Sequence, residues 1–327
     1  MTEQLLYQRP QVNLACSTSL RMWLVSSCAI LAILQSSLTD SFVSLAVALT
    51  TVGAAVLTEF FINLGRRSTG LLDGSAVASA LILTLLLPNQ INPVIAACGA
   101  VFAMAVIKHS FGGLGANWLN PALGGWLFIR VSWPATFIEA LKGAPMSISM
   151  VSGSQNSPLG LISSALNNTV FAMAGSELPS DYLQLLFYPG PGIIGDRGLF
   201  ALILGTIILS AFRSGRFWAS TLFLVLYLFL IRAFGGQPWA GDILFNLFTG
   251  GTLAAAFLLI ADPSSGVKSM GGMAAATALT ALGAALLRIG GGEPYGAIFA
   301  VALVNGISPL IRGFEDRRLY GRLYDRN

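Results

Sequence analysis

The sequence predicts an all-α integral membrane protein with about ten transmembrane helices, arranged as two inverted five-helix repeats that contain half-helices. Of its 327 residues, 55% are hydrophobic and only 10% are charged, whereas a soluble domain carries about a quarter charged residues. Apolar stretches recur along the chain, and each membrane span needs ~20 mostly apolar residues. Glycine and proline interrupt these stretches at matching places in the two halves. Such paired interruptions are typical of transporter-like cores whose site lies between the repeats.

The repeat rests on two stretches of similar sequence. LDGSAVASALILTLLLP at 72–88 corresponds to FTGGTLAAAFLLIADP at 248–263, so that Pro88 pairs with Pro263. Further on, Phe111-Gly112-Gly113 corresponds to Ile289-Gly290-Gly291, and Asn120-Pro121 corresponds loosely to the end of the copy. Chance similarity between two Gly/Ala-rich helices is the alternative interpretation, because small residues are common wherever membrane helices pack closely.

The predicted spans follow one another with short connections, with one exception. They lie at about 22–38, 41–64, 72–88, 92–108, 119–136, 196–212, 217–234, 243–262, 273–289 and 296–311. Glycines at the starts of the third, fifth and tenth spans favour half-helices or unwound turns, which persist at membrane depth only where protein or a cavity covers them. The chain is therefore expected to be a single membrane domain over 1–327, with inverted repeats at about 20–136 and 196–312.

The lysines and arginines predict the orientation. With the N-terminus in the cytoplasm, 13 of the 18 fall on the cytoplasmic side and five on the outer side, as the positive-inside rule expects. Both termini of this multi-pass protein are thus expected in the cytoplasm. Five spans per half is an odd number, so the halves are expected to be inverted. The exceptional connection, 137–190, then lies on the outer side, and a loop of this length is functional or disordered.

Several function classes lack support in the sequence. There is no nucleophile–base pair, phosphate loop or metal cluster, so no catalytic residue and no metal ligand is predicted. Cys16, Cys28 and Cys98 are scattered without C-x-x-C spacing, which gives no basis for a disulfide framework or an iron–sulfur site. His109, the only histidine, is expected at a helix end beside Lys108. The formal charge of +4 is spread over loops and does not indicate nucleic acid.

Three acidic residues in or near the spans are candidates for an ion path. Glu59 lies in the second span, Asp73 opens the third, and Asp262 closes the eighth. Charges at such depth are costly and face a cavity or a partner. Asp73 and Asp262 are alternatively explained as helix-end residues in the interfacial region, with Asp73 capping the third span. Glu59 lies about two turns from Arg66, too far for a simple pair along one helix.

The motifs LLDGSAVASALILTLLLP, HSFGGLGANWLNPALGGWLF and GGTLAAAFLLIADP, with GGGEPYGAIFAVALVNGISPLI, resemble a known family. They are similar to the D subunit of the Rnf ferredoxin:NAD oxidoreductase complex and to its relative, the B subunit of the sodium-translocating NADH:quinone reductase. The resemblance extends from about residue 20 to 320, and the run Phe111–Ala122 is its most specific part. It implies a membrane subunit, without a complete active site of its own, that couples electron transfer to Na⁺ or H⁺ movement.

The resemblance also implies FMN, bound covalently through a phosphoester to a threonine of an outer-side loop. The family motif is Ser/Thr-Gly-Ala-Thr followed by Pro-Leu. Here Pro158-Leu159 fixes the register, which puts Ser157 at the attachment position and Ser154 at the first motif position. Gln155-Asn156 replaces Gly-Ala, and Val151 lies where an acid is expected; glycine permits backbone shapes that glutamine resists. A flavin-less subunit therefore stays open as an alternative.

The partners that the resemblance implies are an outer-side flavin subunit and two small membrane subunits that share an iron–sulfur cluster, and the lipid bilayer surrounds the membrane spans. The quinone-reductase branch also holds riboflavin non-covalently, and no residues of this chain are assigned to it. The main alternative is a stand-alone transporter or channel with an inverted-repeat fold that passes a small solute or ion without flavin. The long outer loop discriminates between the two, because a channel has no need of a hydroxyl in the register of the flavin motif.

Overall fold

The computed structural model describes residues 17–39, 42–66, 73–110, 117, 119–142, 185–186, 192–211, 216–236, 239, 241–262, 267 and 269–324. Regular secondary structure in these residues is helical, and a single β-bridge joins Pro88 to Ile193. The first half contains α1 (Thr18–Thr39), α2 (Val43–Arg66), α3 (Ser75–Leu86), α4 (Pro93–Phe102), the π-helix η2 (Ala103–Lys108), α5 (Pro121–Ser132) and α6 (Pro134–Leu141). The second half contains α9 (Ile194–Arg197), α10 (Leu199–Ala211), α11 (Phe217–Phe234), α12 (Ile243–Phe248), α13 (Thr252–Ala254), the π-helix η5 (Ala255–Ile260), α14 (Met270–Ile289) and α15 (Gly296–Tyr324).

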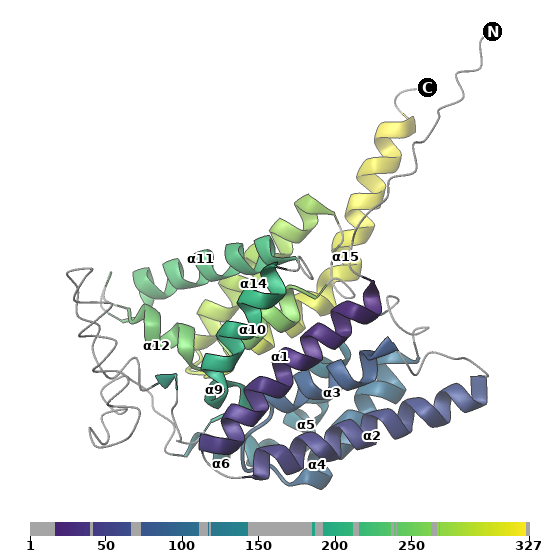
Figure 1. The fold of residues 1–327 in the computed structure, drawn as a ribbon. Helices are drawn as coiled ribbons and strands as arrows, with labels where there is room; N and C mark the ends of the chain where they lie inside the picture. The colour runs from purple at the N-terminus through teal and green to yellow at the C-terminus, as the bar shows by residue number, and fades with distance from the viewer. Residues whose placement is uncertain are drawn as a thin grey trace.

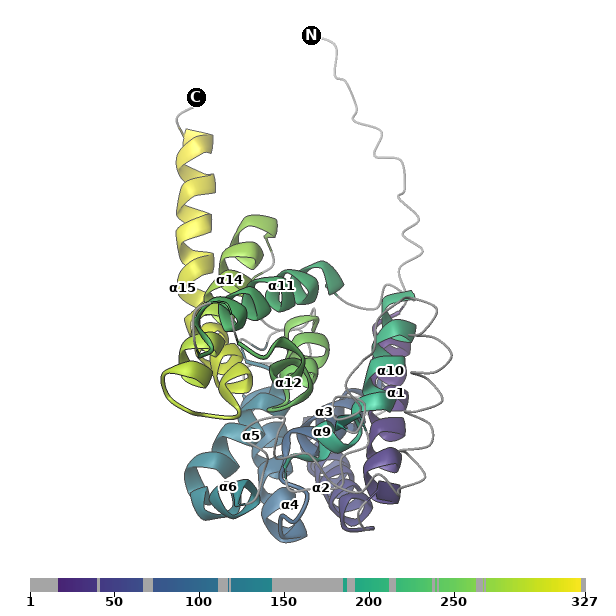
Figure 2. The same cartoon turned by 90° about the vertical axis from the view of Figure 1, so that its left-hand side faces the viewer.

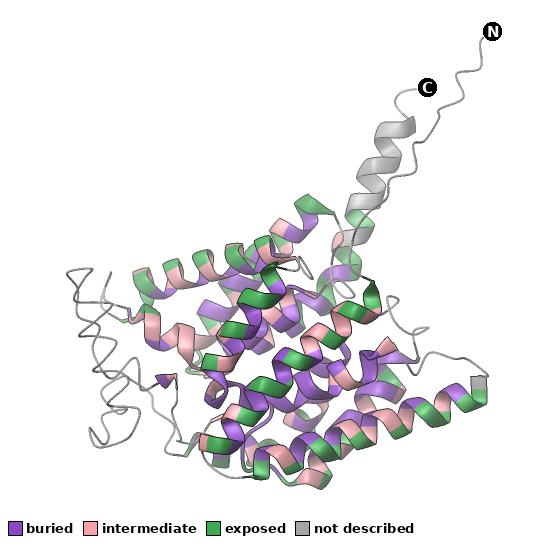
Figure 3. Ribbon diagram, in the orientation of Figure 1, coloured by how far each residue is buried: buried purple, intermediate pink, exposed green. Residues whose placement is uncertain are grey.

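Four helices, α1, α2, α11 and α14, are long and apolar enough to cross a membrane. Further apolar helices of 10–17 residues lie at Ser75–Leu86, Pro93–Lys108, Leu199–Ala211 and Gly296–Ile311. Large apolar side chains stay exposed on the outward face of α2, among them Leu49, Leu57 and Phe61, and Figure 3 shows the exposed faces along α1, α2 and α11. Apolar surface of this extent suits lipid rather than water. The predicted all-α membrane protein is confirmed.

The helices pack in two groups, and α1 with α10 forms a contact between the first and second halves of the chain. Helices α3 and α4 each contact both α2 and α5, and α14 contacts both α11 and α15, while α1 packs against α10 as well as against α2 and α3. Figures 1 and 2 show α1 beside α10, and in Figure 2 this pair lies along the right-hand edge of the molecule. In both views α1 begins and α15 ends toward the top of the molecule. The helical elements adjoining the two termini therefore lie on one side.

Two breaks interrupt the helices at glycines in the left-handed region. Gly74 (φ 73°) precedes α3, and Gly250 and Gly251 (φ 71° and 68°) separate α12 from α13. Side chains other than glycine's are strained at such angles. At 12 residues, α3 is about 18 Å long and too short to cross the ~30 Å hydrocarbon core. The expected interruption before the third span is thus present, whereas the continuous eighth span predicted over 243–262 is wrong, because the glycine pair divides it.

The start of the long connection also differs from the prediction, which puts the fifth span over 119–136 and the loop from 137 onward. Instead α5 ends at Ser132, Trp133 leaves the helical region (φ −129°, ψ 62°), and α6 runs from Pro134 to Leu141. Proline suits the first turn of a helix, where its missing N–H is not needed. The buried Phe137 then anchors α6 against the ring of Trp126, at a centroid distance of 5.7 Å.

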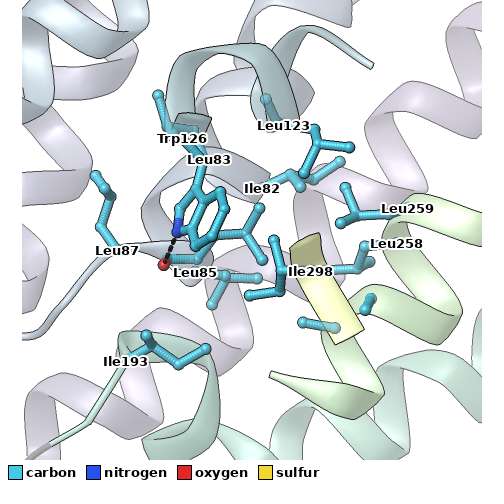
Figure 4. Packing of buried hydrophobic residues seen from close by; sticks show 14 of the residues in the cluster. Ile82, Leu83, Leu85, Leu87, Leu123, Trp126, Ile193, Leu258, Leu259 and Ile298 are labelled. Carbon is cyan, nitrogen blue, oxygen red and sulfur yellow. Dashed lines mark hydrogen bonds between the residues drawn. The ribbon is translucent and has the colours of Figure 1, made fainter. Parts of the chain in front are cut away.

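The ends of α3 and η5 meet in a buried apolar cluster. Figure 4 shows side chains of Ile82, Leu83, Leu85, Leu123, Leu258, Leu259 and Ile298 gathered around the ring of Trp126. The indole Nε1 donates to the Leu86 carbonyl at 2.9 Å, which gives a partner to one of the carbonyls left over at the end of α3. The Leu87 carbonyl accepts from the Ile194 N–H at 2.9 Å. Backbone groups at these helix ends are thereby satisfied away from water.

Candidate functional site

A buried ion pair joins two helices of the first half beside the break before α3. Glu59 lies in α2 and Lys108 is the last residue of η2, and both are 2% exposed. The Lys108 ammonium Nζ donates to Glu59 Oε1 at 2.5 Å and to the Ser75 hydroxyl at 2.6 Å. Because taking two charges out of water is expensive, such a pair persists only where good geometry and further hydrogen bonds compensate.

The pair continues through Ser75 to the acidic residue that opens α3. Asp73 Oδ1 accepts from the Ser75 backbone N–H at 2.9 Å and from its hydroxyl at 2.7 Å. This carboxylate therefore serves one of the free N–H groups in the first turn of α3, where the helix dipole favours negative charge. A chain of hydrogen bonds runs from Glu59 through Lys108 and Ser75 to Asp73. The structure thus brings together two of the three predicted acids.

The hydrogen bond from Lys108 uses only one oxygen of the Glu59 carboxylate, Oε1. The other oxygen, Oε2, is buried and has no hydrogen-bond partner among the residues that the structure describes. His109, at the end of η2, lies with Nε2 3.7 Å from Oε1 of the same carboxylate, which agrees with its expected position at a helix end. The Lys108 ammonium contacts the Glu59 carboxylate directly, and Ser75 joins it to the Asp73 carboxylate. A buried acceptor without a partner is costly and calls for a functional explanation.

The third predicted acid lies in a separate contact. Asp262 follows η5 in the second half, and its Oδ2 accepts from Asn120 Nδ2 at 2.8 Å. Asn120 caps α5 by accepting the Ala122 N–H on Oδ1 at 2.9 Å. Asp262 therefore links the end of one half-helix to the start of a helix in the other half. Asp73 and Asp262 both lie at helix ends, as their alternative explanation expects.

The second break is satisfied in a different way. The Asp196 carboxylate accepts the Gly250 N–H on Oδ2 and the Gly251 N–H on Oδ1, each at 2.9 Å. The short α9 holds this carboxylate against the glycine pair. Consecutive N–H groups in such a turn form a nest that attracts an anion, and here the anion is a side chain. Asp196 is therefore a structural clamp between α9 and the break.

A guanidinium lies on the other side of the second break. Arg288, in the last turn of α14, donates to Asn246 Oδ1 at 2.9 Å, to the Thr249 hydroxyl at 2.8 Å and to the Pro294 carbonyl. Lys108 and Arg288 thus have comparable places, since each lies in the last turn of the helix that follows a broken segment and donates to a hydroxyl at the break. A guanidinium offers five donors in a fixed fork, which suits bridging several backbone and side-chain acceptors.

Sequence reasoning finds the acids of the first break but misses the residues that contact them, Lys108 and Ser75. It also misses Asn120, which contacts Asp262, and Asp196 and Arg288 at the second break. The available signal is charge inside apolar spans, which applies to Lys108 and Asp196 as well as to Glu59. The flavin candidates Ser154 and Ser157 lie outside the described residues. Within the described ranges, no group of three or more His, Cys, Asp or Glu side chains is arranged to hold a metal ion.

Fold and site together define a helical, multi-pass membrane protein with broken helices and charged side chains buried at the breaks. The chain belongs to the NQR2, RnfD, RnfE family, whose model matches residues 6–321. This confirms the family that the motifs indicated.

Relatives with similar sequences cover most of the chain, and each is the D subunit of its complex. That of the proton-translocating ferredoxin:NAD(+) oxidoreductase complex of Clostridium ljungdahlii is 29% identical over 319 residues, which is 95% of this chain and 94% of that protein. The D subunit of the Na(+)-translocating ferredoxin:NAD(+) oxidoreductase complex of Acetobacterium woodii is 28% identical over 250 residues, which is 76% of this chain and 73% of that protein. The D subunit of the ion-translocating oxidoreductase complex of Pseudomonas paraeruginosa is 32% identical over 269 residues, which is 76% of this chain and 75% of that protein.

Proposed function

We propose that this chain is the D-type membrane subunit of an ion-translocating electron transport complex of the ferredoxin:NAD type. The family match over 6–321 and the similarity to the corresponding subunits of such complexes support this function. The observation that carries the ion-translocating part is the buried Glu59–Lys108 pair beside the break before α3, with one carboxylate oxygen unpartnered among the described residues. A charge buried in a membrane domain at this energetic cost is by default functional.

Glu59, Asp73 and Asp262 are the proposed acidic residues of the ion path. Glu59 and Asp73 belong to one hydrogen-bonded chain, and Asp262 lies at the contact between the two halves. Carboxylate oxygens serve equally well for Na⁺ and for a proton. The relatives' names include both a proton-translocating and a Na(+)-translocating complex, so either ion is compatible with this proposal.

The proposed topology is ten spans in two inverted repeats, with both termini in the cytoplasm of a bacterial cell. Helices occur in each of the ten predicted stretches. Gly74 before α3 and Gly251 before α13 occupy equivalent places in the proposed repeats, as do Lys108 and Arg288. In an inverted repeat the two broken segments enter from opposite membrane sides, and their half-helix ends border a site near the bilayer midplane.

We further propose that the outer-side loop carries FMN through Ser157, with Ser154 as the second candidate. Support comes from the family and from Pro158-Leu159, which fixes the register of the motif. Bound FMN would supply one- and two-electron transfer, while the chain fixes its position relative to neighbouring centres. The Ser157 hydroxyl would hold the FMN phosphate as a phosphoester. Riboflavin is a second proposed cofactor, without assigned residues, and an outer-side flavin subunit and membrane subunits sharing an iron–sulfur cluster are the proposed partners.

The flavin proposal is tested on the denatured subunit, purified from cells that contain their flavin transferase. The expected result is a fluorescent band whose intact mass includes one FMN, lost in Ser157→Ala and retained in the matched variant Ser154→Ala. Loss in Ser154→Ala alone would move the attachment to Ser154. A bare mass in the unmodified subunit would refute covalent FMN and favour the flavin-less subunit or the transporter; partner subunits that co-purify would then support the former.

The ion-path proposal is tested in inverted membrane vesicles that contain the whole complex. Glu59→Gln is expected to slow ferredoxin-driven ion uptake at least about tenfold, because the amide keeps the shape of the side chain but removes its charge. Glu139→Gln is the matched control, since Glu139 lies exposed on α6, away from the cluster. Normal uptake by an assembled Glu59→Gln complex would remove Glu59 from the path.

A further inference from the structure

Lys108 is the least expected member of the first cluster. Two carboxylates at a helix break suit a cation, yet an ammonium of the chain itself already contacts one of them. Lys108 is held there firmly, because it donates to Glu59 and to Ser75, and Ser75 is in turn held by Asp73. The long lysine side chain comes from the end of η2, and π-helical turns occur frequently at functional sites.

We propose that Glu59 binds the translocated cation, Na⁺ or a proton, through Oε2, while Lys108 remains on Oε1 as a tethered cation that weakens this binding. The inference rests on the proposed ion-translocating function. Glu59 Oε2 is buried, and no described residue donates a hydrogen bond to it. The residue as a whole is only 2% exposed. Asn63 lies one turn further along α2 and is 5% exposed, so an amide is present on the same face.

The tethered charge answers a problem that any buried cation site has. Two carboxylates in a medium of low dielectric constant attract a cation strongly, and a strongly held ion leaves slowly. A permanent positive charge on the same carboxylate lowers the affinity and speeds the release. Lysine suits this role, since its ammonium is a compact point charge. Lys108 is in this view a determinant of ion affinity.

A purely structural role for Lys108 makes a different prediction. If the ammonium only neutralised Glu59, its removal would lower stability without tightening cation binding. The affinity for the ion therefore separates the two roles, whereas loss of activity alone does not.

The experiment uses the whole complex in vesicles, with ferredoxin-driven uptake measured against Na⁺ concentration at fixed pH, and against pH without Na⁺. Lys108→Met is expected to lower the half-saturating concentration of the coupling ion by about tenfold or more and to lower the maximal rate, because a neighbouring positive charge is removed. Lys108→Arg keeps the charge and is expected to stay within about threefold of the unmodified complex. The arm that responds identifies the ion as Na⁺ or as a proton.

Failure of this inference is distinguishable from failure of the proposed function. If Glu59→Gln impairs uptake but Lys108→Met leaves the half-saturating concentration unchanged, the tethered-cation role is refuted and the ion path stands. If the Glu59→Gln complex transports the ion normally, both the ion-path role of Glu59 and the tethered-cation role of Lys108 are refuted. Should Lys108→Met not assemble, Ser75→Ala decides: it keeps the charge but removes the hydrogen bond from the ammonium to Ser75, so a tighter hold of the ammonium on Glu59 is expected to raise the half-saturating concentration. An unchanged or lower value would overturn the inference.

Discussion

The Glu59–Lys108 pair gives the sharpest test of the structure. Replacing either residue alone, in Glu59→Gln or Lys108→Met, should destabilise the protein far more than replacing both. The side chains are 3% and 2% exposed and their charged atoms lie 2.5 Å apart, so a single replacement leaves an uncompensated charge away from water. Breaking a buried pair in this way costs about 3–5 kcal/mol. The double variant removes both charges, and its cost is expected to be near that of the lost hydrogen bonds, about 1–2 kcal/mol.

Arg130 and Glu293 provide an internal reference for this prediction. Their charged atoms are 3.4 Å apart and their side chains are 17% and 24% exposed. Solvent screens this pair more, and the expected coupling is about 1 kcal/mol or less. Thermal unfolding of the detergent-solubilised complex is measured for the single and double variants of each pair, Arg130→Met and Glu293→Gln serving for the second. Apparent midpoints at one scan rate are compared, because unfolding of such proteins is often irreversible.

The two double-mutant cycles isolate the pairwise terms. A coupling in the first cycle clearly above that in the second, with the first double variant close to the unmodified protein, would confirm that burial governs the pair. A coupling for Glu59–Lys108 no larger than that for Arg130–Glu293 would refute the reasoning. The result is independent of ion transport, since the assay measures stability only.

Two further predictions concern the helix packing and the second break. Gly125→Ala places a methyl group 2.7 Å from the Gly99 carbonyl oxygen and is expected to destabilise the protein by about 1–3 kcal/mol. The control Gly53→Ala, whose added methyl group has nothing within 4 Å among the described residues, should leave the stability unchanged or raise it slightly in the same thermal assay. Equal unfolding midpoints for the two variants would contradict the packing around Gly125. Asp196→Ala should cost more than Asp196→Asn, because alanine leaves both N–H groups of Gly250-Gly251 without an acceptor, and equal losses would argue against the clamp.

The positions of the helices follow from the sequence to a large extent. Apolar length and proline or glycine breaks are enough to place α1 to α5, α10, α11 and α14 within a few residues, whereas α15 continues to Tyr324, beyond the predicted end at 311. The division of the eighth span is missed, because an apolar run does not reveal which glycine adopts a positive φ. Gly250 and Gly251 do so where their N–H groups find the carboxylate of Asp196, 54 and 55 positions away. Such a partner is set by tertiary packing and has no local signature.

The site is predictable only in part for the same reason. Glu59 stands out as a charge in an apolar span, but a search for its partner along the same helix finds none. Lys108 lies 49 positions away and reaches Glu59 because η2 packs against α2. No periodicity along the sequence encodes that distance. A lysine at the end of an apolar span is equally typical of a cytoplasmic anchor under the positive-inside rule.

The two breaks solve one problem of membrane folding with different outcomes for function. Each exposes backbone N–H groups that must be satisfied without water, and each uses a carboxylate, Asp73 at the first break and Asp196 at the second. At the second break each Asp196 oxygen already accepts a backbone N–H, so the carboxylate serves the fold. At the first break Asp73 accepts the backbone N–H of Ser75. Glu59 adds a second carboxylate there, and one of its oxygens has no partner in the part of the chain that the structure describes. Of the two breaks, the first therefore has an acceptor beyond what the described fold consumes, and this is why the proposed cation site lies there.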